Sequence, residues 1–233
     1  MRCVLPSLRQ PVDPEQVPFM KARLGAAVAA LLLVAAAPAA SRPIAYAGAT
    51  TVMFDAGADR REALVFHAPR YWYSLGAGWQ RHRSDDPTQT REVSFVRANL
   101  LARRWNLPSA QANAFVWGSV GSARGGGARG TGANAGFQID YETLDFYSML
   151  KSEWWTSSAW SYRSDTAQLG FAPYRHRYGG WATWLVGMVE NNAGALSGTP
   201  EYSLLARFFN EKAWIEAGVN DRGDPRLMLM FNF

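Results

Sequence analysis

The last eight residues of the chain, 226–233, restrict its possible folds more than any other stretch. Their side chains alternate with a period of two, which is the pattern of a β-strand whose two faces meet different surroundings. One face carries Leu227, Leu229, Phe231 and Phe233, and the other carries Arg226, Met228, Met230 and Asn232. A half-buried strand of a soluble sheet has the same pattern, so the remaining sequence must show what the apolar face meets.

Alternating segments follow one another through most of the chain. We predict ten strands, near residues 72–82, 91–104, 110–121, 135–143, 145–155, 166–173, 179–190, 201–210, 213–220 and 226–233. Residues 51–55 and 63–67 have the composition of two shorter strands, which form either a hairpin in the same sheet, giving twelve strands, or an element at its rim. Within 91–104 the alternation changes phase between Phe95 and Val96, which predicts a β-bulge.

The predicted connections alternate between long and short. The long ones are 83–90, 122–134, 156–165 and 191–200, the short ones are 105–109, 144, 174–178 and 211–212, and 221–225 is of medium length. Successive strands joined in this way are antiparallel, and all the long connections fall at the same end of the sheet.

The N-terminal 47 residues have the features of an export signal. Lys21 and Arg23 precede an apolar run over 24–37, and small-residue cleavage sites follow at 37–39 and 45–47. The run is shorter than the roughly 18–20 residues that a membrane-spanning helix needs, so a cleaved signal peptide fits better than an anchor. We therefore divide the chain into a leader over 1–47, with Met20 as an alternative start, a hairpin or rim segment over 48–70, and a main domain over 71–233.

Removing the leader changes the charge and the cysteine content. The leader holds five of the 24 basic and two of the 19 acidic residues, which leaves 19 and 17 in the rest of the chain. A nearly neutral domain does not predict a nucleic-acid partner. The single cysteine, Cys3, lies in the leader, so we expect neither disulfides nor thiol chemistry in the folded protein.

Two stretches are similar to a known class of proteins. The terminal octapeptide resembles the closing strand of bacterial outer-membrane β-barrels, and residues 103–113 (RRWNLPSAQAN) resemble a strand–turn–strand segment in uncharacterised proteobacterial barrels. The resemblance covers the signal peptide and about 71–233. It implies an all-β fold, a closed antiparallel transmembrane β-barrel in the bacterial outer membrane, with long loops outside and short periplasmic turns. It also implies that Phe231 and Phe233 form an assembly signal for periplasmic chaperones and the barrel-assembly machinery.

A barrel in lipid must close, because unpaired backbone groups in hydrocarbon are costly. Glycines in many of the predicted strands suit the bends that closure requires. Aromatic residues beside the predicted turns suit interfacial girdles, and these are Tyr71, Trp72, Trp105, Trp154, Trp155, Tyr174, Tyr178 and Trp181.

Charged residues on the polar faces are the candidates for a functional site. They are Arg97, Asp140, Glu142, Lys151, Glu153, Arg207 and Glu216. Three roles are open to them: a salt-bridged polar core, the lining of a narrow pore, or a catalytic site. Asp140 and Glu142 are expected to join Lys151 and Glu153 across a very short turn as one cluster.

Other chemistry has weaker support. None of His67, His82 and His176 shares an inward row with a suitable Ser or Glu, which argues against a histidine-dependent hydrolase. The 220–225 segment fits a polar turn better than a calcium loop, and we expect no metal and no cofactor.

The main functional expectation is an integral outer-membrane barrel with a filled or narrow polar interior and a structural or surface role without covalent chemistry. The alternatives are a narrow channel for small solutes or ions, an outer-membrane enzyme acting on lipid or peptide, and a soluble periplasmic barrel binding an apolar ligand. The expected partners include outer-membrane lipid and lipopolysaccharide, whose phosphates Arg124 and Arg129 of the 122–134 loop are placed to meet.

Overall fold

The fold is that of a computed structural model, which describes residues 44, 46–83, 90–175, 180–196, 199–210 and 212–233. Most of the expected leader lies outside these residues. The strands are β1 (Thr50–Ala56), β2 (Arg60–Arg70), β3 (Tyr73–His82), β4 (Arg91–Leu107), β5 (Ala110–Gly125), β6 (Ala128–Glu142), β7 (Phe146–Ser157), β8 (Ser161–Phe171), β9 (Ala182–Gly194), β10 (Glu201–Phe209), β11 (Ala213–Asn220) and β12 (Pro225–Asn232). None of the described residues forms a helix long and apolar enough to cross a membrane.

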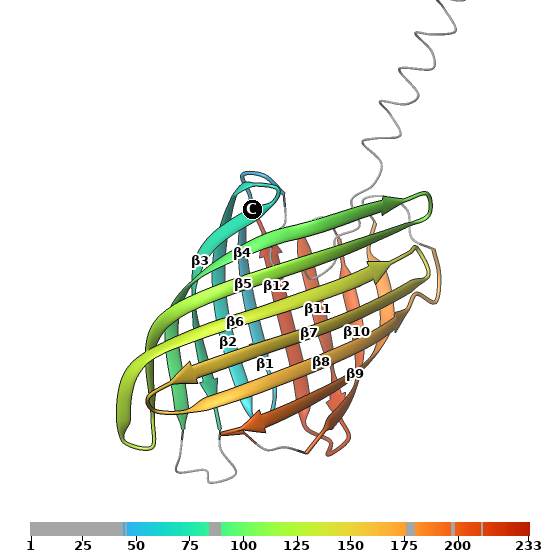
Figure 1. Cartoon of the computed structure of the whole chain (residues 1–233). Helices are drawn as coiled ribbons and strands as arrows, with labels where there is room; N and C mark the ends of the chain where they lie inside the picture. The colour runs from blue at the N-terminus through green and yellow to red at the C-terminus, as the bar shows by residue number, and fades with distance from the viewer. Residues whose placement is uncertain (1–43, 45, 84–89, 176–179, 197–198, 211) are drawn as a thin grey trace, which may run out of the picture. The chain divides into compact units, whose positions relative to one another are not determined.

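The twelve strands form one closed antiparallel barrel (Figure 1). Each strand pairs with its neighbours in sequence, and β12 closes the ring by pairing with β1, where Thr51 lies opposite Asn232. The predicted closed antiparallel β-barrel is therefore confirmed, with the twelve strands that result when the hairpin over 51–67 joins the sheet. The hairpin β1–β2 belongs to the wall, because β1 pairs with β12 and β2 pairs with β3.

Several predicted loops are strand. Residues 122–134 form the ends of β5 and β6, joined by a turn at Gly126 and Gly127, both of which have positive φ. Two successive positive φ values are typical of a two-residue hairpin turn, which glycine allows without strain. The Gly- and Arg-rich composition of this stretch hides its alternation. Residues 156–165 also lie largely in β7 and β8, whereas residues 172–173 and 180–181, which were predicted as strand, lie outside β8 and β9.

The bulge in β4 was placed wrongly from the sequence. The pairing of β4 with β5 shifts between Leu101 and Arg103, not at Phe95 and Val96. Phe95 points inward and Val96 outward, so the alternation continues through this region. Two successive apolar residues look like a change of phase in the sequence. Here Phe95 packs inside the barrel and Val96 lies on its apolar outer surface, so both are apolar without a bulge.

Close approach between strands explains some of the glycines. A Cβ atom built on Gly76 would lie 2.0 Å from the Val65 carbonyl oxygen, and one on Gly218 would lie 2.0 Å from that of Leu204. Neither position has room for a side chain. The close packing of the neighbouring backbone therefore depends on glycine at these two positions.

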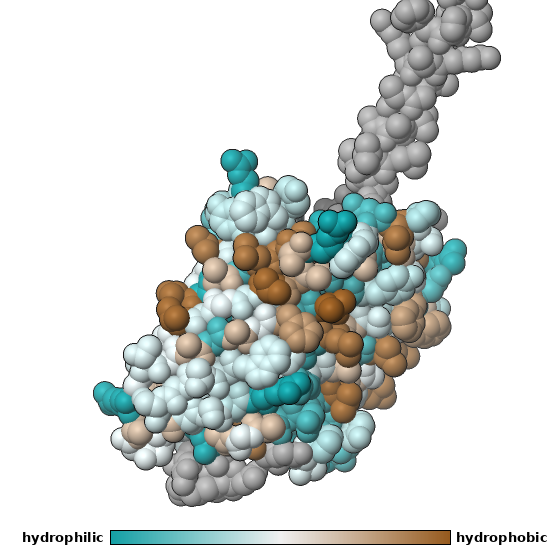
Figure 2. Space-filling view, in the orientation of Figure 1, coloured by the Kyte–Doolittle hydropathy of each residue, from teal (hydrophilic) through white to brown (hydrophobic). Residues whose placement is uncertain are grey.

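The outer surface of the barrel is apolar, and its interior is rich in polar groups. Large apolar side chains are exposed on every strand face that points away from the lumen, including Leu75, Val96, Val120, Leu150, Leu169 and Leu204. Figure 2 shows apolar side chains spread across the strands of one face. This polarity is inverted relative to a soluble barrel and matches proteins whose strands cross a membrane, so the soluble alternative does not fit.

Most of the predicted girdle aromatics are exposed on this surface, namely Tyr71, Trp72, Trp105, Trp154, Tyr174 and Trp181. Trp155 is an exception, with 2% of its surface exposed. It follows Trp154 in β7, and adjacent residues of a strand point to opposite faces, so the two cannot both face outward. Tyr178 lies outside the described residues.

Candidate functional site: the barrel lumen

Arg97 is the centre of one buried polar network. Its Nη2 donates to Glu153 Oε1 at 2.7 Å, and its Nε donates to Ser119 Oγ at 2.8 Å. Lys151 lies on the other side of Glu153, with Nζ 3.8 Å from Oε2. Both partners of the Arg97–Glu153 pair are buried, so each charge depends on the other for compensation.

A second network surrounds Arg207. Its Nε donates to Glu216 Oε2 at 2.6 Å, and its Nη2 donates to Gln168 Oε1 at 2.7 Å. The guanidinium also lies 4.5 Å from the ring centre of Tyr147 and 4.4 Å from that of Trp214. Hydrogen bonds and aromatic faces together replace the water that this buried cation loses.

Asp140 and Glu142 do not join the Lys151 cluster as expected. Lys151 lies opposite Gln138 in the β6–β7 ladder, and Asp140 lies opposite Met149. Asp140 instead accepts hydrogen bonds from Asn113 at 2.6 Å and Gln138 at 3.2 Å, and Glu142 is buried closer to the turn. Lys151 and Glu153 lie further from the β6–β7 turn than Asp140 and Glu142 do, so the antiparallel register offsets the two pairs along the strands.

A third group of charges was missed from the sequence. Arg226 Nη2 lies 3.1 Å from Glu190 Oε2, and its Nη1 lies 2.6 Å from Glu201 Oε1. Arg60 lies nearby in the lumen wall, 3.4 Å from Asp55. The sequence could have identified Arg226, because it shares one face of β12 with Met228 and Met230. Arg60 and Glu190 were harder to identify, because they lie toward strand ends, where the alternation is weak.

The lumen contains a central cavity of about 120 Å³. A smaller pocket of about 40 Å³ lies at the end opposite Thr50 and Phe233, beside the β1–β2 and β11–β12 turns. Arg60, Glu190 and Arg226 line both. These three side chains therefore form a charged partition between the centre of the lumen and its mouth.

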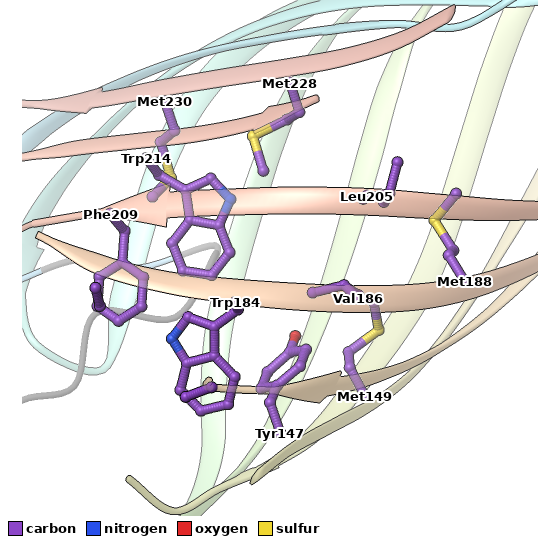
Figure 3. Packing of buried hydrophobic residues seen from close by; sticks show 12 residues of the cluster. Tyr147, Met149, Trp184, Val186, Met188, Leu205, Phe209, Trp214, Met228 and Met230 are labelled. Atoms are coloured by element: carbon purple, nitrogen blue, oxygen red, sulfur yellow. The ribbon is translucent and has the colours of Figure 1, made fainter. Parts of the chain in front are cut away.

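An apolar cluster lies on the other side of the cavity. Trp184, Trp214 and Tyr147 project into the same space between the strands (Figure 3). Trp214 lies opposite Met230 in the β11–β12 ladder, so this cluster is toward the end of the barrel that carries Phe233. It narrows the lumen with aromatic side chains at that end.

All five methionines outside the leader line the central cavity: Met53, Met149, Met188, Met228 and Met230. Methionine is unbranched and has three rotatable side-chain bonds, so it packs adaptably. The apolar part of the cavity wall is consequently the part whose shape changes most easily.

The histidines and the last turn provide no evident chemistry. His82 is buried with Nε2 3.1 Å from the Tyr162 hydroxyl, and His67 Nδ1 lies 3.1 Å from Thr50 Oγ1, while His176 lies outside the described residues. Asn220 accepts hydrogen bonds from the backbone N–H groups of Arg222 and Asp224, which is the geometry of a polar turn. Within the described parts of the chain, no group of three or more His, Cys, Asp or Glu residues is placed to hold a metal ion.

The chain matches no protein-family model and no curated protein in sequence. Two solved structures are similar in fold. One is the KdgM porin in complex with disordered oligogalacturonate, with a TM-score of 0.49 and 10% identity, covering 79% of this chain and 98% of the porin. The other is the KdgM porin, with a TM-score of 0.44 and 9% identity over the same shares. Function must therefore be inferred from the residues of this chain.

Proposed function

We propose that the protein is an integral outer-membrane β-barrel that forms a narrow channel for small solutes or ions. The membrane assignment is supported by the closed wall, the apolar outer surface and the even number of strands, which brings both ends of the wall to one side. The outer membrane is the bacterial membrane in which such single-chain barrels reside, and the expected signal peptide agrees with export.

The observation that carries the channel proposal is the central cavity with its charged lining. Barrels of about eight strands are filled by side chains, and those of sixteen or more enclose water, so twelve strands fall between these cases. The lining includes Arg60, Lys151 and Arg226 as well as Glu62 and Glu190. Charges of both signs let a permeating ion exchange part of its hydration shell for protein groups.

A purely structural role, the main expectation from the sequence, finds less support than this alternative. A solidly packed polar core would leave no central space, whereas here charged side chains surround a cavity, and three of them also line a second pocket at the mouth. The partition of Arg60, Glu190 and Arg226 and the aromatic cluster at the opposite end restrict passage to small species.

Planar-bilayer recording of the refolded protein tests the proposal. We expect small stepwise conductances in KCl, altered by substitutions at the partition and unaffected by Arg103→Gln, an exposed position outside the lumen. Folded protein that inserts into the bilayer but shows no conductance, even when both Glu190 and Arg226 are replaced by glutamine, would reject the channel.

A further inference from the structure

A row of arginines crosses the outer face of the barrel at the end opposite Thr50 and Phe233. The strand register places Arg61 opposite Arg81, Arg81 opposite Glu92, Glu92 opposite Arg124, and Arg124 opposite Arg129. The row therefore passes from β2 to β6 at one level of the strand register. With about 4.8 Å between neighbouring strands, its four steps extend over roughly 19 Å.

The arginines point away from the lumen and are exposed. Glu92, the one carboxylate of the row, is hydrogen-bonded to Arg124, with Nε 2.7 Å from Oε2, and its Oε1 lies 3.6 Å from Arg81 Nε. It holds the two guanidiniums beside each other while the row keeps an excess of three positive charges. Arg124 still has 61% of its side-chain surface exposed, so this contact leaves most of the guanidinium accessible.

The row also borders a hollow in the surface. Arg81, Glu92, Arg124 and Arg129 line an open groove of about 630 Å³, together with the Gly126–Gly127 turn. The absence of side chains at the two glycines keeps this groove open, and the arginines on both sides of it face a common space. The surface thus has the shape and charge of a site for an anion larger than a simple ion.

Four residues further along each strand, the same outer face is apolar. Val65, Val96 and Val120 occupy one level of this face, and all three are exposed. The distance along a strand is about 13 Å, at 3.3 Å per residue. A ligand that spans both levels needs an anionic head at the arginine row and acyl chains against the valines.

We propose that this row binds the phosphate groups of lipid A, the membrane anchor of lipopolysaccharide. The inference rests on the proposed outer-membrane location with Thr50 and Phe233 at the periplasmic end, which puts the opposite end of the barrel in the leaflet that faces outward. Lipid A carries phosphates on a broad sugar head above several acyl chains, and guanidinium groups bind phosphate through paired, charge-assisted hydrogen bonds. Arg124 and Arg129 were expected from the sequence to meet these phosphates, and the strand register adds Arg61 and Arg81.

Native mass spectrometry of the full-length barrel, refolded in zwitterionic detergent, can measure binding of bisphosphorylated lipid A. Replacing Arg61, Arg81, Arg124 and Arg129 together by glutamine is expected to weaken binding at least about tenfold, because the paired charge-assisted contacts are lost. The matched control, R70Q/R103Q, removes two exposed arginines at the opposite end of the barrel and should leave binding unchanged. Heat-modifiable gel mobility confirms that each variant is folded.

Removing the phosphates from the ligand should have the same effect as removing the arginines from the protein. Dephosphorylated lipid A should therefore bind the wild type weakly, about as weakly as the fourfold variant binds bisphosphorylated lipid A. Equal binding by the fourfold variant and the wild type, or by the two forms of lipid A, would overturn the proposal. Phosphatidylglycerol that competes equally at the same charge concentration would also overturn it, since the row would then recognise any anionic lipid. Fractionation of the native cells separately tests the outer-membrane location, so failure of that location is distinguishable from failure of the binding site.

Discussion

Arg97 and Glu153 show how a single buried pair supports the interior of the barrel. The contact is 2.7 Å, and the Glu153 side chain is fully buried. Removing one member of such a pair leaves the other charge without compensation, which costs far more than the pair itself contributes.

We therefore expect Glu153→Ala to lower the free energy of unfolding by about 3 kcal/mol, measured by urea titration in detergent micelles. The double variant R97A/E153A should lose less stability than the sum of the losses in R97A and E153A, because removing Glu153 then no longer leaves Arg97 buried without its carboxylate. A loss in the double variant equal to that sum would contradict the pairing.

The charged partition gives a residue-level prediction about transport. Glu190→Gln removes a negative charge from the partition and should shift the reversal potential in a KCl gradient toward anion selectivity. Arg226→Gln should shift it in the opposite direction. Shifts of the same sign in both variants would show that these side chains do not line the path of the ion.

Outside the strands, Asp145 and Arg175 form an exposed pair at 2.7 Å. The hydrogen bond from Arg175 lowers the pKa of Asp145. The stability that this pair contributes is thus present above the ordinary carboxyl pKa and is lost as the pH falls through the lowered one. Because the pair is exposed, the contribution is small. Arg175→Gln should raise the pKa of Asp145, as followed by NMR titration, whereas an unchanged pKa would contradict the contact.

At the scale of elements, β12 depends on its backbone more than on its last side chain. Phe233 exchanges two backbone hydrogen bonds with Thr50, at 2.9 and 3.0 Å, while its side chain is 73% exposed. The side chain therefore adds little packing to the folded barrel, and its expected role as an assembly signal stays a prediction.

We predict that Phe233→Ala reduces the amount of folded barrel in cells without reducing its stability after refolding in vitro. Heat-modifiable mobility of membrane fractions gives the first quantity, and urea unfolding of purified protein gives the second. A matched loss of stability in vitro would assign the residue a structural role instead. The variant Leu227→Ala, six residues earlier on the same alternating face, serves as the control and should not reduce the amount of folded barrel in cells as Phe233→Ala does.

The elements also differ in how well the sequence predicts them. Strands such as β6 and β12 were recognised because their two faces differ sharply in polarity. The outer ends of β5 and β6 were missed because small and charged residues occupy both faces there. The composition of a strand beyond the apolar belt resembles that of a loop, and only its pairing distinguishes the two.

At the scale of the whole molecule, the barrel is closed by the hairpin that the sequence left ambiguous. Without β1 and β2, both β3 and β12 would have an unpaired edge. We expect a chain beginning at Tyr71 to fail to form a heat-modifiable barrel in detergent, since closure would require a β3–β12 register that the full barrel does not use. If the unboiled truncated chain migrated faster on a denaturing gel than the boiled chain, this expectation would be contradicted.

The order of residues by itself determined that the chain forms antiparallel strands with one apolar face, because side-chain alternation is a local property of each strand. It also identified Arg97, Glu153, Arg207 and Glu216 as candidate interior charges. Only the tertiary structure decided which charges meet. Arg226 reaches Glu190 and Glu201 from β12, across strands that are not its sequence neighbours. Such contacts depend on the tilt, stagger and number of all the strands, which closure sets jointly and which no single segment encodes.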